Sequence, residues 1–250
     1  MSQVGTYWPV YTGKSFNLWE ADTGVYSASV EPSVACEALQ RKRENGHRNS
    51  KSAFSRMPSE WVSDPSTLPC LAPRIAIRDT TNSTNTRTII CALVPQDVVI
   101  THQAPYLLRI LGTARDEALL LGVLSSMILD WYARRVVELH LTASHLNNFP
   151  VPNPGEGHPV RDRVVEIAGR LAAVDDRFAE WAAEVGVPVG SANDEATKQD
   201  LIHELDACVA HLYGLDEDDL EVIYTTFDEK RPDRYLDRLA AVIEHFRRLA

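Results

Sequence analysis

Residues 74–95 read RIAIRDTTNSTNTRTIICALVP, and this stretch decides the fold of the first half of the chain. Apolar runs rich in β-branched residues predict strands at 74–78 and 87–94, with a polar loop between them. A third strand is predicted at 97–101, and residues 106–111 could pair with these strands. We therefore expect a mixed, mostly antiparallel sheet in this part of the chain.

The polar loop between the first two strands contains the residue types that read DNA. Arg78 and Arg87 can each donate two hydrogen bonds to guanine, and Asn82 and Asn85 can do the same to adenine. The surrounding threonine and serine hydroxyls can hold phosphates. We take these four residues as candidates for base or phosphate contacts, with a plain polar hairpin connection as the alternative.

The flanking segments predict further β structure and helices. Aromatic runs broken by Gly and Asp turns indicate short strands within residues 7–30. A helix is expected over 33–45 after Pro32, and residues 114–139 have the apolar spacing of a helix. Gly122 and Ser125-Ser126 are small residues inside that helix and would allow a neighbour to approach closely.

The second half of the chain is predicted to be helical. Three prolines and a glycine lie between Pro150 and Gly155, so residues 151–159 are the expected linker. Apolar periodicity predicts four helices after it, over 160–184, 195–213, 216–227 and 232–249. We therefore predict the α+β class, with a sheet and packed helix in residues 1–150 and a helical region in residues 160–250.

The charge of -10 is distributed unevenly between these two parts. Residues 1–150 contain 14 Lys+Arg and 13 Asp+Glu, a net of +1, whereas residues 151–250 contain 11 Lys+Arg and 22 Asp+Glu, a net of -11. The first half is therefore the expected surface for a polyanion. Its basic residues outside the loop are candidates for backbone contacts, with a solvated flexible segment as the alternative: Lys14, Arg41, Lys42, Arg43, Arg48 and Lys51.

The motifs of several enzyme classes are missing from the sequence. There is no Gly-x-Gly turn for a methyltransferase cofactor, no phosphate-binding loop and no nucleophile elbow. Asn153-Pro154-Gly155 does not supply the Pro-Pro-aromatic loop that holds a target amine. We therefore assign no catalytic residue and expect no cofactor on this chain.

The candidate metal motifs are incomplete. His203-Glu204 begins like a zinc-protease helix, but Ala207 stands where the second histidine is needed. Asp228-Glu229-Lys230 resembles the end of a nuclease motif without a partner carboxylate on a strand. Four widely spaced cysteines and no visible signal peptide lead us to expect a cytoplasmic protein with reduced thiols.

Four pieces of sequence, in order, carry a resemblance to a known family. They are Pro9–Trp19, the 74–95 stretch with Ala92-Leu93-Val94-Pro95, Leu121–Ser126 leading into Phe149–Pro152, and Glu204–Leu215 with Phe227. Together the chain resembles the C-terminal target-recognition region of adenine-specific DNA methyltransferases. These belong to type IIG restriction–modification enzymes and to BREX- and DISARM-like phage-defence systems.

The resemblance implies that this chain reads double-stranded DNA as the specificity part of such a system. It also implies that S-adenosylmethionine binds on a methyltransferase catalytic domain or subunit, which this chain lacks. The competing interpretation is a non-catalytic interaction subunit whose acidic helical half docks a catalytic partner. A stand-alone nuclease is a third possibility, for which no metal site is credible.

Overall fold

The computed structural model describes residues 7–81, 85–228 and 235–249. Near the N-terminus, β1 (Trp8–Tyr11) lies between β2 (Ala28–Val30) and β5 (Val99–Ile100). β1 runs antiparallel to β2, with Pro9 opposite Ser29, and parallel to β5, with Val10 opposite Val99. This small mixed sheet joins the N-terminal segment to residues almost ninety positions further along the chain.

A second sheet comes from the two apolar runs of the 74–95 stretch. β3 (Arg74–Ile77) and β4 (Cys91–Val94) pair antiparallel, with Ile75 opposite Leu93, and all eight residues are buried. A single bridge from Ala76 to Tyr106 extends the pairing towards the 106–111 segment. Strands at 74–78, 87–94 and 97–101 are thus confirmed in type, although each is shorter than predicted and they form two sheets.

The shorter second strand has a local cause. The backbone N–H groups of Thr88 and Ile89 both donate to the carboxylate of Asp130, at 2.9 and 2.6 Å. A backbone donor bound to a side chain is not available to a neighbouring strand, so pairing before Cys91 is reduced to one hydrogen bond of 2.8 Å, from Arg78 N to the Ile90 carbonyl.

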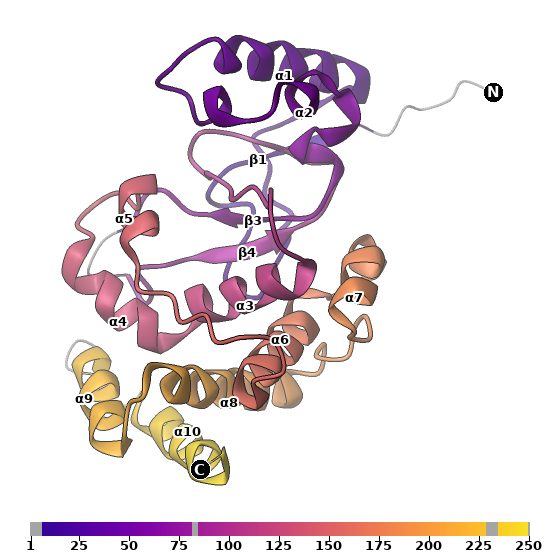
Figure 1. The fold of residues 1–250 in the computed structure, drawn as a ribbon. Helices are drawn as coiled ribbons and strands as arrows, with labels where there is room; N and C mark the ends of the chain where they lie inside the picture. The colour runs from indigo at the N-terminus through magenta and orange to yellow at the C-terminus, as the bar shows by residue number, and fades with distance from the viewer. Residues whose placement is uncertain (1–6, 82–84, 229–234, 250) are drawn as a thin grey trace.

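Between the sheets the chain forms α1 and a series of short turns. α1 (Pro32–His47) starts with proline in its first turn, and the Glu31 carboxylate accepts hydrogen bonds from Ser33 N and Val34 N. Short helical elements follow it: η1 (Ala53–Arg56), α2 (Ser59–Ser63), η2 (Pro65–Thr67) and η3 (Pro69–Leu71). In Figure 1, α1, η1 and α2, which we call the α1 segment, form one end of the molecule, above both sheets.

The predicted helix over 114–139 is two helices, α3 (Ala114–Ser125) and α4 (Met127–Val136). Ser126 has an extended backbone, and its hydroxyl accepts a hydrogen bond from Leu129 N at 3.2 Å. The carboxylate of Asp206 accepts Met127 N at 2.8 Å. Ser126 therefore acts as the N-cap of a new helix, a role that the continuous apolar periodicity did not reveal.

The remainder of the chain is helical, as expected for an α+β fold followed by a helical region. Its elements are α5 (Ala143–Asn148), α6 (Pro159–Ala172), η4 (Asp176–Phe178), α7 (Ala179–Val185), α8 (Glu195–Tyr213), α9 (Glu217–Asp228) and α10 (Leu236–Leu249). The predicted 160–184 helix is interrupted after Ala172, where Asp175 caps η4. Gly214, with φ 68°, ends α8, and Asp216 accepts Asp219 N at the start of α9, both as predicted.

One hydrophobic core joins the sheet to the helical region. α3 lies beside β4 on one side and packs against α6 and α8 on the other (Figure 1). Gly122 makes this possible, because an added Cβ would lie 2.9 Å from Val164 Cγ1 and 3.2 Å from Ala168 Cβ. The close approach predicted at Gly122 is therefore confirmed. No helix among the described residues has the length and apolar character needed to cross a membrane.

Candidate nucleic-acid interface

A polar cleft of about 470 Å³ lies where the N-terminal turn, the 85–90 loop and the helical region meet. Its walls come from both halves of the chain. The lining residues are Asn17, Leu18, Trp19, Arg78, Asn85, Thr86, Arg87, Ile90, Lys198, Gln199, Ile202 and Arg238. We call this feature the cationic cleft, because four of these side chains are basic and none is a carboxylate.

The turn at one wall of the cleft is held tightly. Asn17 and Glu20 exchange two backbone hydrogen bonds of 2.9 and 3.0 Å. Between them Trp19 has φ 55°, a left-handed conformation that is costly for a large side chain and persists only when its surroundings enforce it. Here the Trp19 ring is buried, and its carbonyl accepts a 3.0 Å hydrogen bond from Lys198 Nζ. The turn is thereby attached to α8.

Arg78 extends from the end of β3 along the same turn. Its Nη2 atom donates to the carbonyl of Phe16 at 3.0 Å, and Cγ lies 3.1 Å from the point that a Cβ on Gly13 would occupy. A side chain at position 13 would therefore push the arginine aside. Burial lowers the pKa of Arg78, but an arginine remains protonated in a folded protein.

Arg87 is anchored at the junction between α3 and α4. Its Nη2 atom donates to the carbonyls of Ser125 and Ser126, each at 2.7 Å, and its Nε lies 3.4 Å from Asp130 Oδ2. The carbonyls at a helix C-terminus carry partial negative charge and favour a cation. Arg87 therefore shapes the cleft wall as well as contributing charge to it.

A second arginine, Arg134 on α4, holds the 85–90 loop through its backbone carbonyls. Arg134 Nη2 donates to the carbonyls of Asn85 and Thr86, at 2.9 and 3.1 Å, and its guanidinium lies over the Phe227 ring. Arg134 is also 3.8 Å from Asp130. The buried carboxylate of Asp130 thus contacts both Arg87 and Arg134 and accepts the backbone N–H of Thr88. The loop is therefore held in place beside two positively charged side chains.

The remaining cations of the cleft come from the helical region. Lys198 lies on α8 and Arg238 on α10, and both are partly exposed. Arg238 forms no ion pair within the described residues, and its guanidinium lies 5.9 Å from the centre of the Tyr235 ring. Positive charge in a concave, partly desolvated site attracts anions more strongly than the same charge on an open surface.

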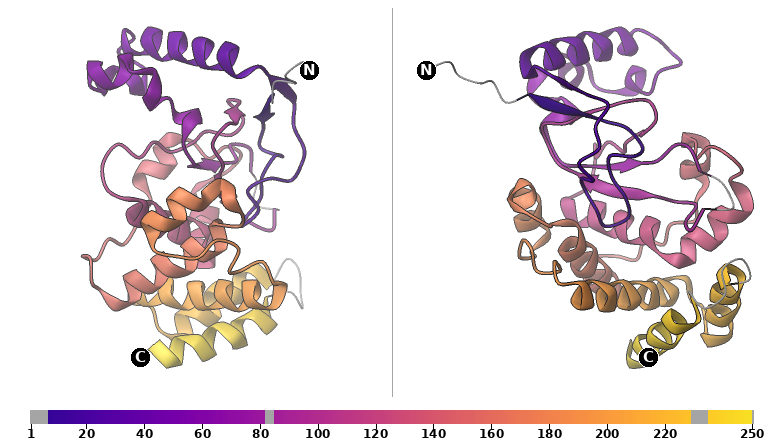
Figure 2. Two further views of the ribbon diagram at one scale, coloured as in Figure 1. Left: turned by 90° about the vertical axis from the view of Figure 1, so that its right-hand side faces the viewer. Right: turned by 180° about the vertical axis from the view of Figure 1, so that it is seen from behind.

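The structure brings some of the predicted DNA-contacting residues together and separates others. Arg78, Asn85 and Arg87 share the cationic cleft. Asn82 lies outside the described residues. The other predicted residues with exposed side chains are Lys14, in the turn after β1, and Arg41, Lys42, Arg48 and Lys51, on α1 or just after it. α1 is at the end of the molecule opposite α8 and α10 in both views of Figure 2, so the four cations on or just after α1 are remote from the helical wall of the cleft. Lys14 belongs to the turn that leads to Asn17 and Trp19 of the cleft.

Arg43 differs from its neighbours on α1, because its side chain is only 2% exposed. Its guanidinium donates to Thr67 Oγ1 at 2.8 Å and to the Asp64 carbonyl at 2.7 Å, and lies over the Trp61 ring. It therefore ties α1 to the turns that follow and does not present a surface for phosphate. Helical spacing explains the difference, since Arg41 and Lys42 point to other faces of the same helix.

Sequence reasoning missed four polar residues of the cleft: Asn17, Lys198, Gln199 and Arg238. The net charge of -11 over residues 151–250 concealed the two cations among them. A signal was present in the spacing of α8, where Lys198, Gln199 and Ile202 fall on one face.

His203 and His211 lie eight residues apart on α8, and neither belongs to a metal site among the described residues: the Nε2 atom of His203 is buried without a hydrogen-bond partner there. His211 stacks on Phe246 with 3.9 Å between ring centres, and its Nε2 lies 2.9 Å from the Phe246 carbonyl. Within residues 7–81, 85–228 and 235–249, no group of three His, Cys, Asp or Glu side chains could hold a metal ion. Glu229 and Lys230 of the acidic run lie outside this part of the chain.

Comparison with known proteins yields one structural neighbour to report. No protein family model matches the chain, and no curated protein sequence matches it. The fold is similar to part of the type IIL restriction–modification enzyme MmeI, solved in complex with DNA, with a TM-score of 0.42 and 14% sequence identity. The match covers 97% of this chain and 31% of the MmeI chain, so this chain spans about a third of that protein's length.

Proposed function

We propose that this chain recognises double-stranded DNA, and that the DNA contacts it at the cationic cleft. The observation that supports this is the lining of the cleft, which has four basic side chains and no carboxylate. Neutralising backbone phosphates is the main source of affinity in protein–DNA complexes, and it requires such a surface. The polar amides at positions 17, 85 and 199 add groups that can donate and accept hydrogen bonds.

The contacts divide into two kinds by position. Arg78 and Asn85 both line the cleft from the segment between β3 and β4, and their side chains are the proposed readers of base edges. Lys198 and Arg238 come from rigid helices on the opposite wall and are the proposed phosphate contacts. Arg87 has its Nη2 donors committed to the protein and acts mainly by fixing the loop and adding charge.

The exposed cations of the α1 segment are proposed to hold the DNA backbone beyond the cleft. They are Arg41, Lys42, Arg48 and Lys51, and exposed Lys14 could contribute in the same way from the turn after β1. Contacts of this kind increase affinity for all sequences alike and make binding sensitive to salt. Arg43 is excluded from this set by its burial.

The larger role that we propose is the specificity part of an adenine-specific DNA methyltransferase, in a restriction–modification or phage-defence system. The support is the order of the four sequence pieces described above, two of which, around Trp19 and at 74–95, supply walls of the cleft. In this proposal S-adenosylmethionine and the methyl transfer belong to a catalytic domain or subunit outside residues 1–250.

The test compares two arginines on the same helix. Fluorescence anisotropy would measure binding of a labelled random-sequence duplex to the full chain over a salt series, for Arg238→Gln and for Arg248→Gln. Arg248 is exposed on α10 and pairs with Glu244, outside the cleft. We expect Arg238→Gln to weaken binding several-fold and to reduce the slope of log K against log salt by about 1, with Arg248→Gln unchanged. Equal effects of the two variants, or no binding at low salt, would contradict the proposal.

A competition experiment separates DNA from a small anionic ligand. The cleft volume also lies within the range of about 300–1,000 Å³ that is usual for small-molecule sites. If unlabelled duplex displaces the labelled DNA and a free nucleoside monophosphate does not, the duplex is the ligand. Displacement by the mononucleotide at a similar concentration would show a nucleotide-binding pocket instead.

A further inference from the structure

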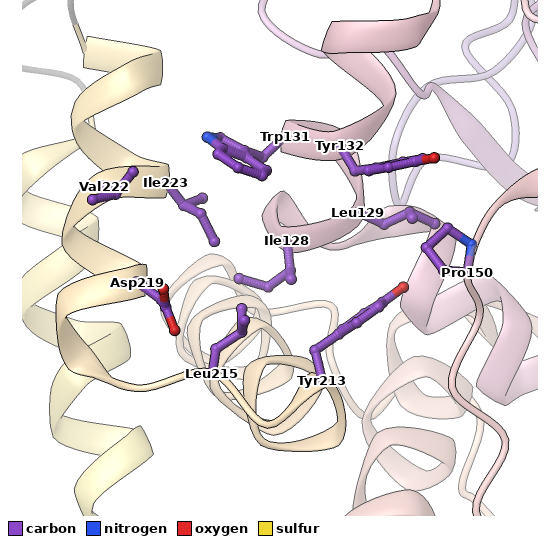
Figure 3. Close-up of a pocket in the computed structure, with 10 residues that line it drawn as sticks. All are labelled: Ile128, Leu129, Trp131, Tyr132, Pro150, Tyr213, Leu215, Asp219, Val222 and Ile223. Atoms are coloured by element: carbon purple, nitrogen blue, oxygen red, sulfur yellow. The ribbon is translucent and has the colours of Figure 1, made fainter.

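A second, apolar pocket lies on the helical side of the molecule, away from the residues of the cationic cleft. Its volume is about 200 Å³, and it lies between α4, α9 and the end of α8 (Figure 3). Figure 3 shows Trp131 and Tyr132 on one side, Val222 and Ile223 on the other, and Tyr213 and Leu215 facing them from below. At one margin Trp131 Nε1 donates to Thr226 Oγ1 at 3.4 Å, which joins α4 to α9.

The walls of this pocket are more exposed than a finished core would be. Val222 is 57% exposed and Tyr132 is 37% exposed. The hydroxyl of Tyr213 is buried but has no hydrogen-bond partner among the described residues, and burial raises its pKa. A buried hydroxyl usually has a partner, so a carbonyl from a bound molecule would complete this one.

The size of the pocket indicates the kind of occupant. Pockets for cofactors and other small molecules usually measure about 300–1,000 Å³, and this one is smaller. A single large apolar side chain is the usual anchor in a protein–protein contact. The pocket also lies between two helices, an arrangement that accommodates an amphipathic helix laid along the groove.

The charge around the pocket indicates which side chains of the partner would lie beside the inserted apolar side chain. α9 contains five acidic residues and no Lys or Arg. Glu217 is paired with Arg247, whereas Asp218, Asp219 and Glu221 are exposed. Arg135, over the Trp131 ring, is a nearby cation on the α4 side. An acidic rim on one side of an apolar pocket is complementary to a basic partner.

We infer that this pocket binds a protein partner through an amphipathic helix, which inserts one large apolar side chain and places Lys or Arg against α9. The inference is independent of the DNA-binding proposal, because the two sites share no lining residue. It gives a binding role to the acidic helix α9, which contributes no residue to the cationic cleft.

The test uses a display library of helical peptides with randomised exposed positions, selected against the full chain. We expect selected peptides to share one Leu, Phe or Trp flanked by Lys or Arg on the neighbouring turns. Anisotropy with a labelled selected peptide should show at least a tenfold loss of affinity for Val222→Asp, and a smaller loss for Glu221→Lys. Val25→Asp is the matched control, because Val25 is 51% exposed and lies outside the pocket.

Several results would overturn the inference. These are no enrichment from the library, selection of acidic peptides, or equal binding of a selected peptide to the Val222→Asp and Val25→Asp variants. Saturable binding of 1-anilinonaphthalene-8-sulfonate that is lost only in Val222→Asp, without any selected peptide, would assign the pocket to a small apolar ligand instead.

Discussion

The guanidinium of Arg87 lies against the carboxylate of Asp130, with 3.4 Å between Nε and Oδ2, and the Asp130 side chain is completely buried. The same carboxylate accepts the backbone N–H groups of Thr88 and Ile89 and faces Arg134. Asp130 on α4 therefore holds in place a loop that carries three of the predicted DNA-contacting side chains.

Asp130→Asn should destabilise the fold strongly. The change leaves two largely buried arginines without their counter-charge, and breaking a buried ion pair from one side costs about 3–5 kcal/mol. Urea unfolding followed by circular dichroism would measure this cost. Glu138→Gln, at an exposed position just after the same helix, should change the free energy of unfolding little. A cost below 1 kcal/mol for Asp130→Asn would show that the carboxylate does not hold the loop.

Arg78 and Arg87 should respond differently to replacement by alanine. Arg78→Ala removes one hydrogen bond to the Phe16 carbonyl, so we expect a small effect on stability. If Arg78 reads a base, the change should cost about 1–3 kcal/mol of DNA affinity and relax sequence preference. Arg87→Ala removes the contacts to Ser125, Ser126 and Asp130, so it should lower both stability and affinity.

These two effects can be separated by measuring urea unfolding and duplex binding on the same samples. The duplex would carry a preferred site selected from a random library, and a scrambled duplex would report specificity. Unchanged affinity and preference in Arg78→Ala would remove Arg78 from the recognition set. An Arg87→Ala variant that is fully stable would show that the anchoring contacts are unimportant.

Much of the fold could be predicted from local sequence signals. The apolar runs predicted as strands at 74–78 and 87–94 are confirmed in type, although the second strand begins only at Cys91. The glycine that ends a helix at 214 and the periodicity of α8 also act over a few residues, and both predictions are confirmed. The helix break at Ser126 was not predicted, because the residue that stabilises it lies far away in the sequence. Asp206 caps Met127 from a position 79 residues later in the chain.

The residues of the cationic cleft could likewise be predicted from the sequence only in part. Arg78, Asn85 and Arg87 could be identified because they share one loop. Lys198 and Arg238 join them only through the packing of α8 and α10, which no local pattern encodes. Arg43 was predicted to be a surface cation because it follows Arg41 and Lys42 in a basic run, but its side chain is buried.

Gly122→Val should be strongly disfavoured if α3, α6 and α8 share one core. Even an added Cβ would lie 2.9 Å from Val164 Cγ1 and 3.3 Å from Leu205 Cδ1, and overpacking of this kind costs about 1–3 kcal/mol. The measurement is the midpoint of thermal unfolding. Gly155→Ala is the control, because no atom lies within 4 Å of an added Cβ there. Equal midpoints for the two variants would mean that the helices can separate at little cost.

Glu117 should make stability depend on pH. Its side chain is buried on α3, where its Oε2 accepts Trp181 Nε1 at 3.0 Å and lies 3.6 Å from Arg109 Nε. Burial raises the pKa of Glu117 above its ordinary value of 4.5, and the Trp181 and Arg109 contacts offset this only in part. The folded state therefore binds the proton more tightly than the unfolded state does.

The sign of the effect follows from that difference. The contribution of Glu117 to the free energy of unfolding is complete below pH 4.5, decreases as the pH rises, and is lost above the raised pKa. Glu117→Gln keeps a neutral acceptor for Trp181 and cannot ionise, so its stability relative to the wild type should increase over this range. Urea unfolding at a series of pH values from about 4 to about 7 measures the difference. Glu180→Gln is the control, since Glu180 is exposed on α7, is not among the groups that shift the pKa of Glu117, and should leave the pH profile unchanged. Parallel profiles for the wild type and Glu117→Gln would show that Glu117 has the same proton affinity in the folded and unfolded states.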